Sequence, residues 1–311
     1  MKEGMERICT GAAMLTAMTM AMGNPSVLWA QQTPQQPPMF SATASLVPIS
    51  VSVRDERGRP VVGLSREDFE VYSDDTLQPI TDFRSEPSPI TTALLIDKSG
   101  SMRVSSRAAD VSNAAHQLVS WMSPVTDRLG LFAFDTNLTQ TSAFAAVSAN
   151  SLRDMATVAP FGATSLYDAL DETSAALGRE GSPRRAVVAL TDGTDNASLL
   201  TPSQVAGRAA AIDVPVYIIS VTMPIDHPTT GVGNRSAQPH LAELAAWTGG
   251  QHFVASTPSQ MSLAARTIVT ELRQQYLLAF VPDPRQGWHR LTVRTRQPRL
   301  TARARAGYIT R

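Results

Sequence analysis

The middle of the chain alternates short, almost continuous apolar runs with stretches whose apolar residues recur at helical spacing. Runs typical of strands that are covered on both faces lie at 92–96, 129–134, 186–190, 214–221 and 251–254. Apolar positions three and four residues apart predict helices at 104–122, 165–177, 202–212, 240–247 and 259–276. Strands that alternate with helices indicate an α/β fold with a doubly wound, mainly parallel sheet, and we place this unit at 90–275.

Both ends of the chain instead carry the period of two that is typical of half-exposed strands. Strand-like segments separated by turn signals fill residues 41–89, and further alternating segments fill residues 276–311. Neither stretch is long enough to bury a core alone. We therefore predict that the two stretches pair into one small β-sandwich-like domain, into which the α/β unit is inserted.

Two features of these end segments concern exposure to solvent. Pro48 lies in the first strand-like segment and, because proline lacks a backbone N–H, it favours an edge position. The C-terminal segment is rich in arginine, with no acid close in sequence, which favours the solvated face of an edge hairpin over a polyanion site. These arginines are Arg290, Arg294, Arg296, Arg299, Arg303 and Arg305.

Residues 1–30 are typical of an export signal. A weakly basic start precedes an apolar run at 8–22, and small residues end at Ala30, which offers a cleavage site. The run is too short for a comfortable membrane span, and we expect no stable membrane span once the signal has been cleaved. Residues 31–40 form a Gln- and Pro-rich linker that we expect to be flexible. We predict an exported protein that is periplasmic, at the cell surface or secreted; a buried helix behind a misassigned start codon is the alternative.

Composition changes this picture little. Hydrophobic residues make up 43% of the 311 residues and charged residues 17%, which is ordinary for a globular protein. The formal net charge is zero, so nothing indicates nucleic acid or an anionic membrane as the main partner. The one cysteine, Cys9, lies inside the predicted signal, so the mature chain would hold no disulfide and would depend on core packing.

The candidate chemistry lies in three loops of the middle unit. Asp97, Ser99 and Ser101 follow its first buried strand, Thr164 precedes its second helix, and Asp192 follows its third strand. The carboxyl ends of parallel strands share one edge of the sheet, and open α/β sheets bind ligands there. We therefore expect these two carboxylates and three hydroxyls to converge at that edge.

This set of oxygen donors suits a hard divalent cation, Mg²⁺ or Mn²⁺. With the hydroxyls in direct contact and Asp97 and Asp192 mostly outside the first shell, the metal would stay electron-poor. Its open position would then favour a carboxylate from a partner. Zinc is disfavoured because no cysteine remains and the five histidines show no ligand spacing. Two alternatives are that a metal only stiffens the loops and that the hydroxyls only cap helices, a role that suits Ser101 and Thr164.

Together, Asp97-x-Ser99-x-Ser101, Thr164 and Thr191-Asp192-Gly193 resemble the complete metal-ion-dependent adhesion site of von Willebrand factor type A domains. The resemblance spans about 90–275 and implies a Rossmann-like fold, a bound divalent metal and a protein partner that offers an Asp or Glu carboxylate. The flanking segments also resemble an exported bacterial family related to such domains, which is common in acidobacteria.

Three functions from different classes follow from these features. The first, which we predict, is a metal-ion-dependent protein-binding or adhesion module of the cell envelope. The second is an envelope scaffold or assembly component with a structural metal. The third is a metal-assisted hydrolase, for which Asp135 and Asp195 are the available acids, neither with a recognisable partner. We therefore predict that the protein is not an enzyme.

A loop at 223–239 follows the strand at 214–221 and contains Asp226 and His227. Because it follows a strand end, we expect it at the rim of the site, where these two residues would contribute to recognition. An inert surface insertion is the alternative.

Overall fold

The computed structural model describes residues 46–103, 107–148, 150–153, 161–222 and 238–310, which all belong to one compact unit, Ala44–Arg311. The predicted export signal and linker at 1–40 lie outside the described residues, as do Asp226 and His227. Within the described residues, no helix is long and apolar enough to cross a membrane.

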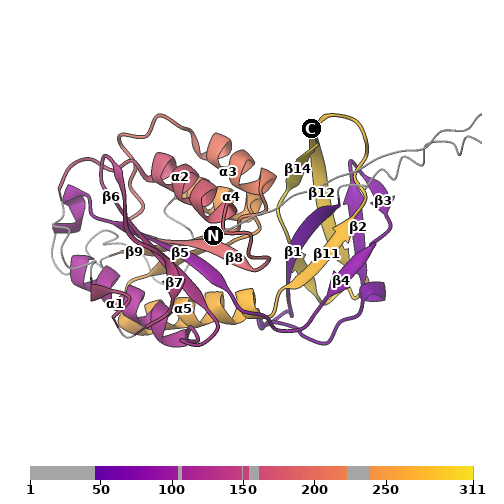
Figure 1. Ribbon diagram of the computed structural model, residues 1–311, viewed down its shortest axis with the longest axis horizontal. Coiled ribbons are helices and arrows are strands. Elements are labelled where there is room, and N and C mark those ends of the chain that lie inside the picture. The colour runs from indigo at the N-terminus through magenta and orange to yellow at the C-terminus, as the bar shows by residue number, and fades with distance from the viewer. Residues whose placement is uncertain (1–45, 104–106, 149, 154–160, 223–237, 311) are drawn as a thin grey trace, which may run out of the picture. The chain divides into compact units, whose positions relative to one another are not determined.

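A six-stranded sheet with the strand order β10-β9-β8-β5-β6-β7 carries the α/β part of the fold (Figure 1). Neighbouring strands from β10 to β6 are parallel, and β7 pairs antiparallel to β6 at one edge. The predicted mainly parallel, doubly wound sheet is therefore confirmed. β7 was not predicted, because its sequence is polar and rich in alanine. The strands are β5 (Thr91–Asp97), β6 (Arg128–Phe134), β7 (Leu138–Ala146), β8 (Arg185–Thr191), β9 (Val216–Val221) and β10 (His252–Ala255).

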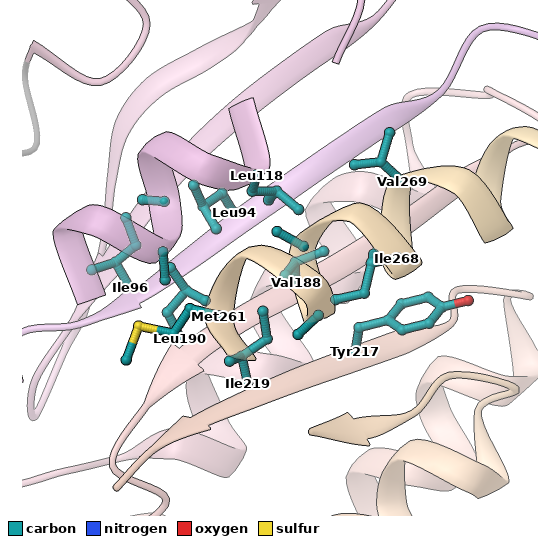
Figure 2. Packing of buried hydrophobic residues seen from close by; sticks show 14 of the residues in the cluster. Leu94, Ile96, Leu118, Val188, Leu190, Tyr217, Ile219, Met261, Ile268 and Val269 are labelled. Atoms are coloured by element: carbon teal, nitrogen blue, oxygen red, sulfur yellow. The ribbon is translucent and has the colours of Figure 1, made fainter. Parts of the chain in front are cut away.

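Helices cover both faces of this sheet (Figure 1). On one face lie α1 (Arg107–Trp121) and α5 (Pro258–Arg273), and on the other α2 (Leu166–Gly178), α3 (Pro202–Ala211) and α4 (Pro239–Trp247). Side chains of β5 alternate between the two cores, since Leu94 packs with α1 and α5 whereas Leu95 packs with the other three helices. Figure 2 shows the first core, in which Leu118 and Ile268 meet the sheet. This two-sided burial explains the continuous apolar runs in the sequence.

Two four-stranded antiparallel sheets contain the ends of the chain, in the orders β13-β1-β11-β4 and β14-β12-β2-β3. Strands from the two ends pair directly, β1 with β11 and β2 with β12, and one apolar cluster joins both sheets. The predicted pairing of the end segments is therefore seen, while the domain boundaries stay a prediction. The strands are β1 (Val47–Arg54), β2 (Phe69–Ser73), β3 (Thr76–Gln78), β4 (Asp82–Arg84), β11 (Tyr276–Phe280), β12 (Gly287–Thr295), β13 (Thr301–Arg303) and β14 (Gly307–Thr310).

The edge position expected at Pro48 is only half right. β1 lies between two strands, because β11 pairs with its first part and β13 with its last part, from Ser52 to Arg54. Pro48 lies in the part that pairs with β11 alone. One open side is enough to tolerate the missing backbone N–H.

The prediction that the C-terminal arginines form a solvated face is wrong for Arg303 and Arg305. Arg305 is 3% exposed and donates to the carbonyls of Ala210 and Pro48, both at 2.6 Å. Arg303 pairs with Glu271 of α5. The groups that hold these guanidiniums come from distant parts of the chain, so local sequence gave no sign of them.

Glu271 joins the end of α5 to the β strands. It is 2% exposed and pairs with Arg54 of β1 as well as Arg303 of β13, while the Tyr217 hydroxyl donates to it at 2.6 Å. Burial alone would raise the pKa of Glu271, but the guanidiniums of Arg303 and Arg54 overcome that effect and hold this pKa below its usual value. The carboxylate is therefore a charged structural link.

Candidate metal centre

Hydrogen bonds tie together the three loops that carry the predicted site. Between the first two loops, the Gly100 N–H donates to the carbonyl of Gly162 at 2.9 Å. The Thr191 hydroxyl at the end of β8 donates to Asp97 at 2.6 Å. The loop of Thr164 also contacts the loop after β8, because the Thr164 carbonyl accepts the Asn196 N–H at 3.0 Å. The loops therefore meet at the carboxyl edge of the sheet, as parallel topology predicts.

Asp97 ends β5 and is 1% exposed. One carboxylate oxygen accepts the Ser99 N–H at 2.8 Å, and the other accepts the Thr191 hydroxyl at 2.6 Å. Burial raises the pKa of Asp97; these hydrogen bonds offset that only in part, and the charge of Asp192 raises it further. Since both oxygens already accept protein hydrogen bonds, Asp97 fits a place outside the direct shell of a metal.

Ser99 and Ser101 lie in a tight turn that continues as a 3-10 helix, Gly100–Arg103. Their side-chain oxygens are 3.0 Å apart, and Ser99 is 1% exposed. A Cβ at Gly100 would stand 3.2 Å from the carbonyl of Gly162, so glycine allows the close approach of the two loops. Two adjacent hydroxyls are thus held at one point.

Thr164 is 2% exposed and does not cap the helix that follows it. The N-cap of α2 is Ser165, whose side chain makes no capping bond. Asp195 caps the helix instead and accepts the backbone N–H groups of Leu166 at 2.8 Å and Tyr167 at 3.3 Å. The capping interpretation of Thr164 is therefore wrong, and so is the view of Asp195 as an acid without a partner.

Asp192 follows β8 and is 9% exposed. One oxygen accepts the Thr194 hydroxyl at 2.7 Å, and the other faces a guanidinium nitrogen of Arg107 at 3.4 Å. Gly193, at φ +85°, allows the turn between these partners. Sequence reasoning missed Arg107, because no motif connects the first residue of α1 with a loop 85 residues away.

The structure therefore brings the predicted residues to one edge, some by direct contact and others through their loops. Asp97, Ser99 and Ser101 are linked directly, and Arg107 lies between Asp192 and the carbonyl of Ser101, at 3.4 and 3.5 Å. The set pairs two buried carboxylates with neutral hydroxyls, a donor chemistry that fits a hard divalent cation. Among the described residues, no group of three or more His, Cys, Asp or Glu side chains is placed to hold a metal ion, so the candidate centre depends on its hydroxyls as well as its two acids. Metal binding by these residues stays a prediction.

A shallow pocket lies beside the Asp192 loop. Its lining includes Gly193 and Thr194 of that loop, with Tyr167, Gln238 and His240 from the neighbouring helices. The rings of Tyr167 and His240 meet edge to face, with centroids 6.3 Å apart. The part of the rim that the structure describes is therefore aromatic and polar.

Comparison with known proteins agrees with this geometry. Residues 92–194, which include the strand ends and all five predicted ligands, match the family model of the von Willebrand factor type A domain. The chain contains a von Willebrand factor type A domain. No curated protein matches the chain. The narrower resemblance to an acidobacterial exported family stays a prediction.

Solved structures are similar at low identity. BatB from Bacteroides thetaiotaomicron is 16% identical, with a TM-score of 0.48, over 58% of this chain and 98% of that one. A von Willebrand factor type A protein from Catenulispora acidiphila is 11% identical, also with a TM-score of 0.48, over 87% and 76%. Proximal thread matrix protein 1 from the mussel byssus, with a zinc-occupied MIDAS motif, is 16% identical, with a TM-score of 0.48, over 71% and 50%.

Proposed function

We propose that this protein is a metal-ion-dependent protein-binding or adhesion module of the cell envelope. Ser99, Ser101 and Thr164 would hold Mg²⁺ or Mn²⁺ directly, and Asp97 and Asp192 would supply negative charge from outside the direct shell. The partner would complete the shell with an Asp or Glu carboxylate. Von Willebrand factor type A domains commonly mediate metal-dependent protein interactions, which supports this assignment.

The observation that carries the proposal is the pair of buried acids beside neutral hydroxyls. Asp97 and Asp192 are 1% and 9% exposed, and hydrogen bonds alone leave the pKa of Asp97 raised. A divalent cation supplies the missing positive charge, and neutral hydroxyl ligands leave it able to attract a further carboxylate.

Binding is favoured over catalysis. A metal-assisted hydrolase needs a base free to take a proton near the ion. Of the two acids considered, Asp195 accepts the first backbone N–H groups of α2, and Asp135 accepts one backbone N–H in its own loop, from Asn137 at 2.9 Å. Within the described part of the chain, neither acid forms a hydrogen bond or an ion pair with a side chain of the proposed metal site. We therefore propose a non-enzymatic role. The signal-like residues 1–30 support export to the periplasm, the cell surface or the medium.

Metal titration of two variants, each of which lacks one buried threonine hydroxyl, tests the site. Thr164→Val removes one proposed ligand while keeping side-chain shape, and we expect Mg²⁺ and Mn²⁺ affinity to fall at least about tenfold. Thr173→Val is the matched control, because the Thr173 hydroxyl is buried in α2 without a partner in the described structure. Calorimetry with Mg²⁺, Mn²⁺ and Zn²⁺ would measure both. Equal affinities for the two variants would contradict the ligand assignment.

Capture from the native envelope tests the partner. Wild-type protein should retain a partner in Mg²⁺ and release it in EDTA, and Thr164→Val should retain less. Cross-linking of the captured complex would then identify the partner's Asp or Glu at the interface, and replacing that residue by Asn or Gln should abolish capture. Retention that EDTA does not affect would favour the scaffold with a structural metal.

A further inference from the structure

Arg107 places a positive charge inside the candidate metal centre. It is the first residue of α1, and its side chain is 13% exposed. One guanidinium nitrogen lies 3.4 Å from the Asp192 carboxylate and 3.5 Å from the carbonyl of Ser101. Arg107 therefore contacts both the loop that carries Asp192 and the loop that carries Ser99 and Ser101.

The electrostatics of the helix do not favour a cation at the start of α1. The amino-terminal end of a helix carries partial positive charge, which disfavours arginine in the first turn. The guanidinium turns to the buried carboxylate of Asp192, which offsets this repulsion. The charge on Asp192 also acts on the buried Asp97, so Arg107 pairs with one of two acids whose charges interact.

We propose that Arg107 is the built-in counter-ion of this site. In the absence of metal it neutralises Asp192 and keeps the loops together, and it opposes the entry of a divalent cation. The arginine and the metal draw on the same negative charge, so each weakens the hold of the other. Arg107 thereby lowers metal affinity and limits the cost of the metal-free state. This inference rests on the proposed metal site.

The test is Arg107→Gln, which removes the charge and keeps a polar side chain of moderate length. We expect the dissociation constant for Mg²⁺, measured by calorimetry, to fall about tenfold. Without metal, the variant should melt at a lower temperature than wild type. Saturating Mg²⁺ should then raise its melting temperature by more than it raises that of wild type.

Arg208→Gln is the matched control, because Arg208 pairs with Asp171 at 2.8 Å on the exposed side of α2 and α3. It makes the same change in net charge away from the site, so its Mg²⁺ affinity should stay that of wild type. A tenfold gain in this control would show that net charge acts at long range and would overturn the assignment to Arg107.

Other outcomes also decide the matter. If Arg107→Gln melts lower in both states and binds Mg²⁺ as wild type does, Arg107 only anchors the helix. If Mg²⁺ affinity is unchanged but partner capture is lost, Arg107 contacts the partner, and the counter-ion role is again wrong. A wild type that binds no divalent ion would overturn the metal site itself, a separate failure.

A measurement on the wild type covers the case in which Arg107→Gln does not fold. The side-chain N–H resonance of Arg107 should shift during Mg²⁺ titration, while that of Arg208 should not. If both signals stay in place at saturating Mg²⁺, the metal and Arg107 do not compete for charge, and the inference fails.

Discussion

Asp97 and Glu271 are equally buried carboxylates whose pKa values move in opposite directions. Asp97 is 1% exposed and Glu271 2%. Burial opposes ionisation at both positions, and it prevails at Asp97, whose pKa is raised, whereas the pKa of Glu271 is lowered. The difference lies in the partners, because two guanidiniums contact Glu271 whereas hydrogen bonds hold Asp97.

Hydrogen bonds satisfy the oxygens of a carboxylate, but they do not supply an opposite charge. The Glu271 cluster has its cations built in, so it needs nothing from solution and acts as a structural joint. At the other cluster, the Asp97 carboxylate is joined by Asp192, and the ion pair described there comes from Arg107. One arginine beside two acids leaves a net negative charge at the Asp97 cluster, which marks it as a cation site. Two arginines contact the single carboxylate of Glu271, which marks that cluster as a structural link.

The largest expected effect is on stability, at the Glu271 cluster. Glu271→Gln leaves the guanidiniums of Arg54 and Arg303 without their carboxylate, so the free energy of unfolding should fall by about 3 kcal/mol. Urea titration measures this, and the loss should be the same with and without Mg²⁺. Glu243→Gln, at an exposed position of α4, is the control and should change little. A loss that Mg²⁺ reverses would place Glu271 in the metal site and break the comparison.

The next effect concerns the Asp97 cluster and its gain in stability on binding Mg²⁺. At a Mg²⁺ concentration 100 times the dissociation constant, wild type should gain about 2.7 kcal/mol of stability, and Asp97→Asn should gain almost none. The metal-free variant should be affected much less, since an uncharged side chain costs less to bury. Thermal unfolding with Mg²⁺ and with EDTA checks both. Equal metal-induced gains in the two proteins would mean that Asp97 plays no part in the site.

A smaller effect separates helix capping from metal binding. Asp195→Ala removes the acceptor for the first N–H groups of α2, so the free energy of unfolding should fall by about 1.5 kcal/mol. Metal affinity should stay within about threefold of wild type, a change of less than 0.7 kcal/mol. Calorimetry with Mg²⁺ measures it, and a loss as large as that of Asp97→Asn would add Asp195 to the site.

The smallest expected effect concerns the pair of His289 and Asp74, whose charges compensate each other only when His289 is protonated. His289 is 3% exposed, and its ring nitrogens face Asp74 at 2.7 Å and the carbonyl of Arg285 at 2.8 Å. Two acceptors favour the imidazolium, so the hydrogen bond to Asp74, and then that to Arg285, raise the pKa of His289 above 6.5. The resulting stability is complete below the unfolded pKa and is lost as pH rises through the folded pKa.

Unfolding measured between pH 6 and pH 9 should therefore show wild type losing stability as pH rises, an effect that His289→Gln removes. His116→Gln, at an exposed position of α1, is the matched control and should keep the wild-type pH dependence. A pH dependence that survives in His289→Gln would assign it to another group.

Much of the α/β part could be predicted from the sequence, because its signals are local. The apolar run at 92–96 became β5, and the helical period at 165–177 became α2. β7 was missed because its residues are half exposed and lack apolar alternation. The site loops were placed correctly because the carboxyl ends of parallel strands share an edge.

The sequence by itself determined where Asp97, Ser99, Ser101, Thr164 and Asp192 lie, since each follows from a strand end or a helix start. Only the tertiary structure decided their charge balance. Arg107 reaches Asp192 across 85 residues, and Glu271 meets Arg54 across 217. Periodicity reports which face of an element is buried, but the compensation of a buried charge depends on which distant side chains folding brings within a few ångströms.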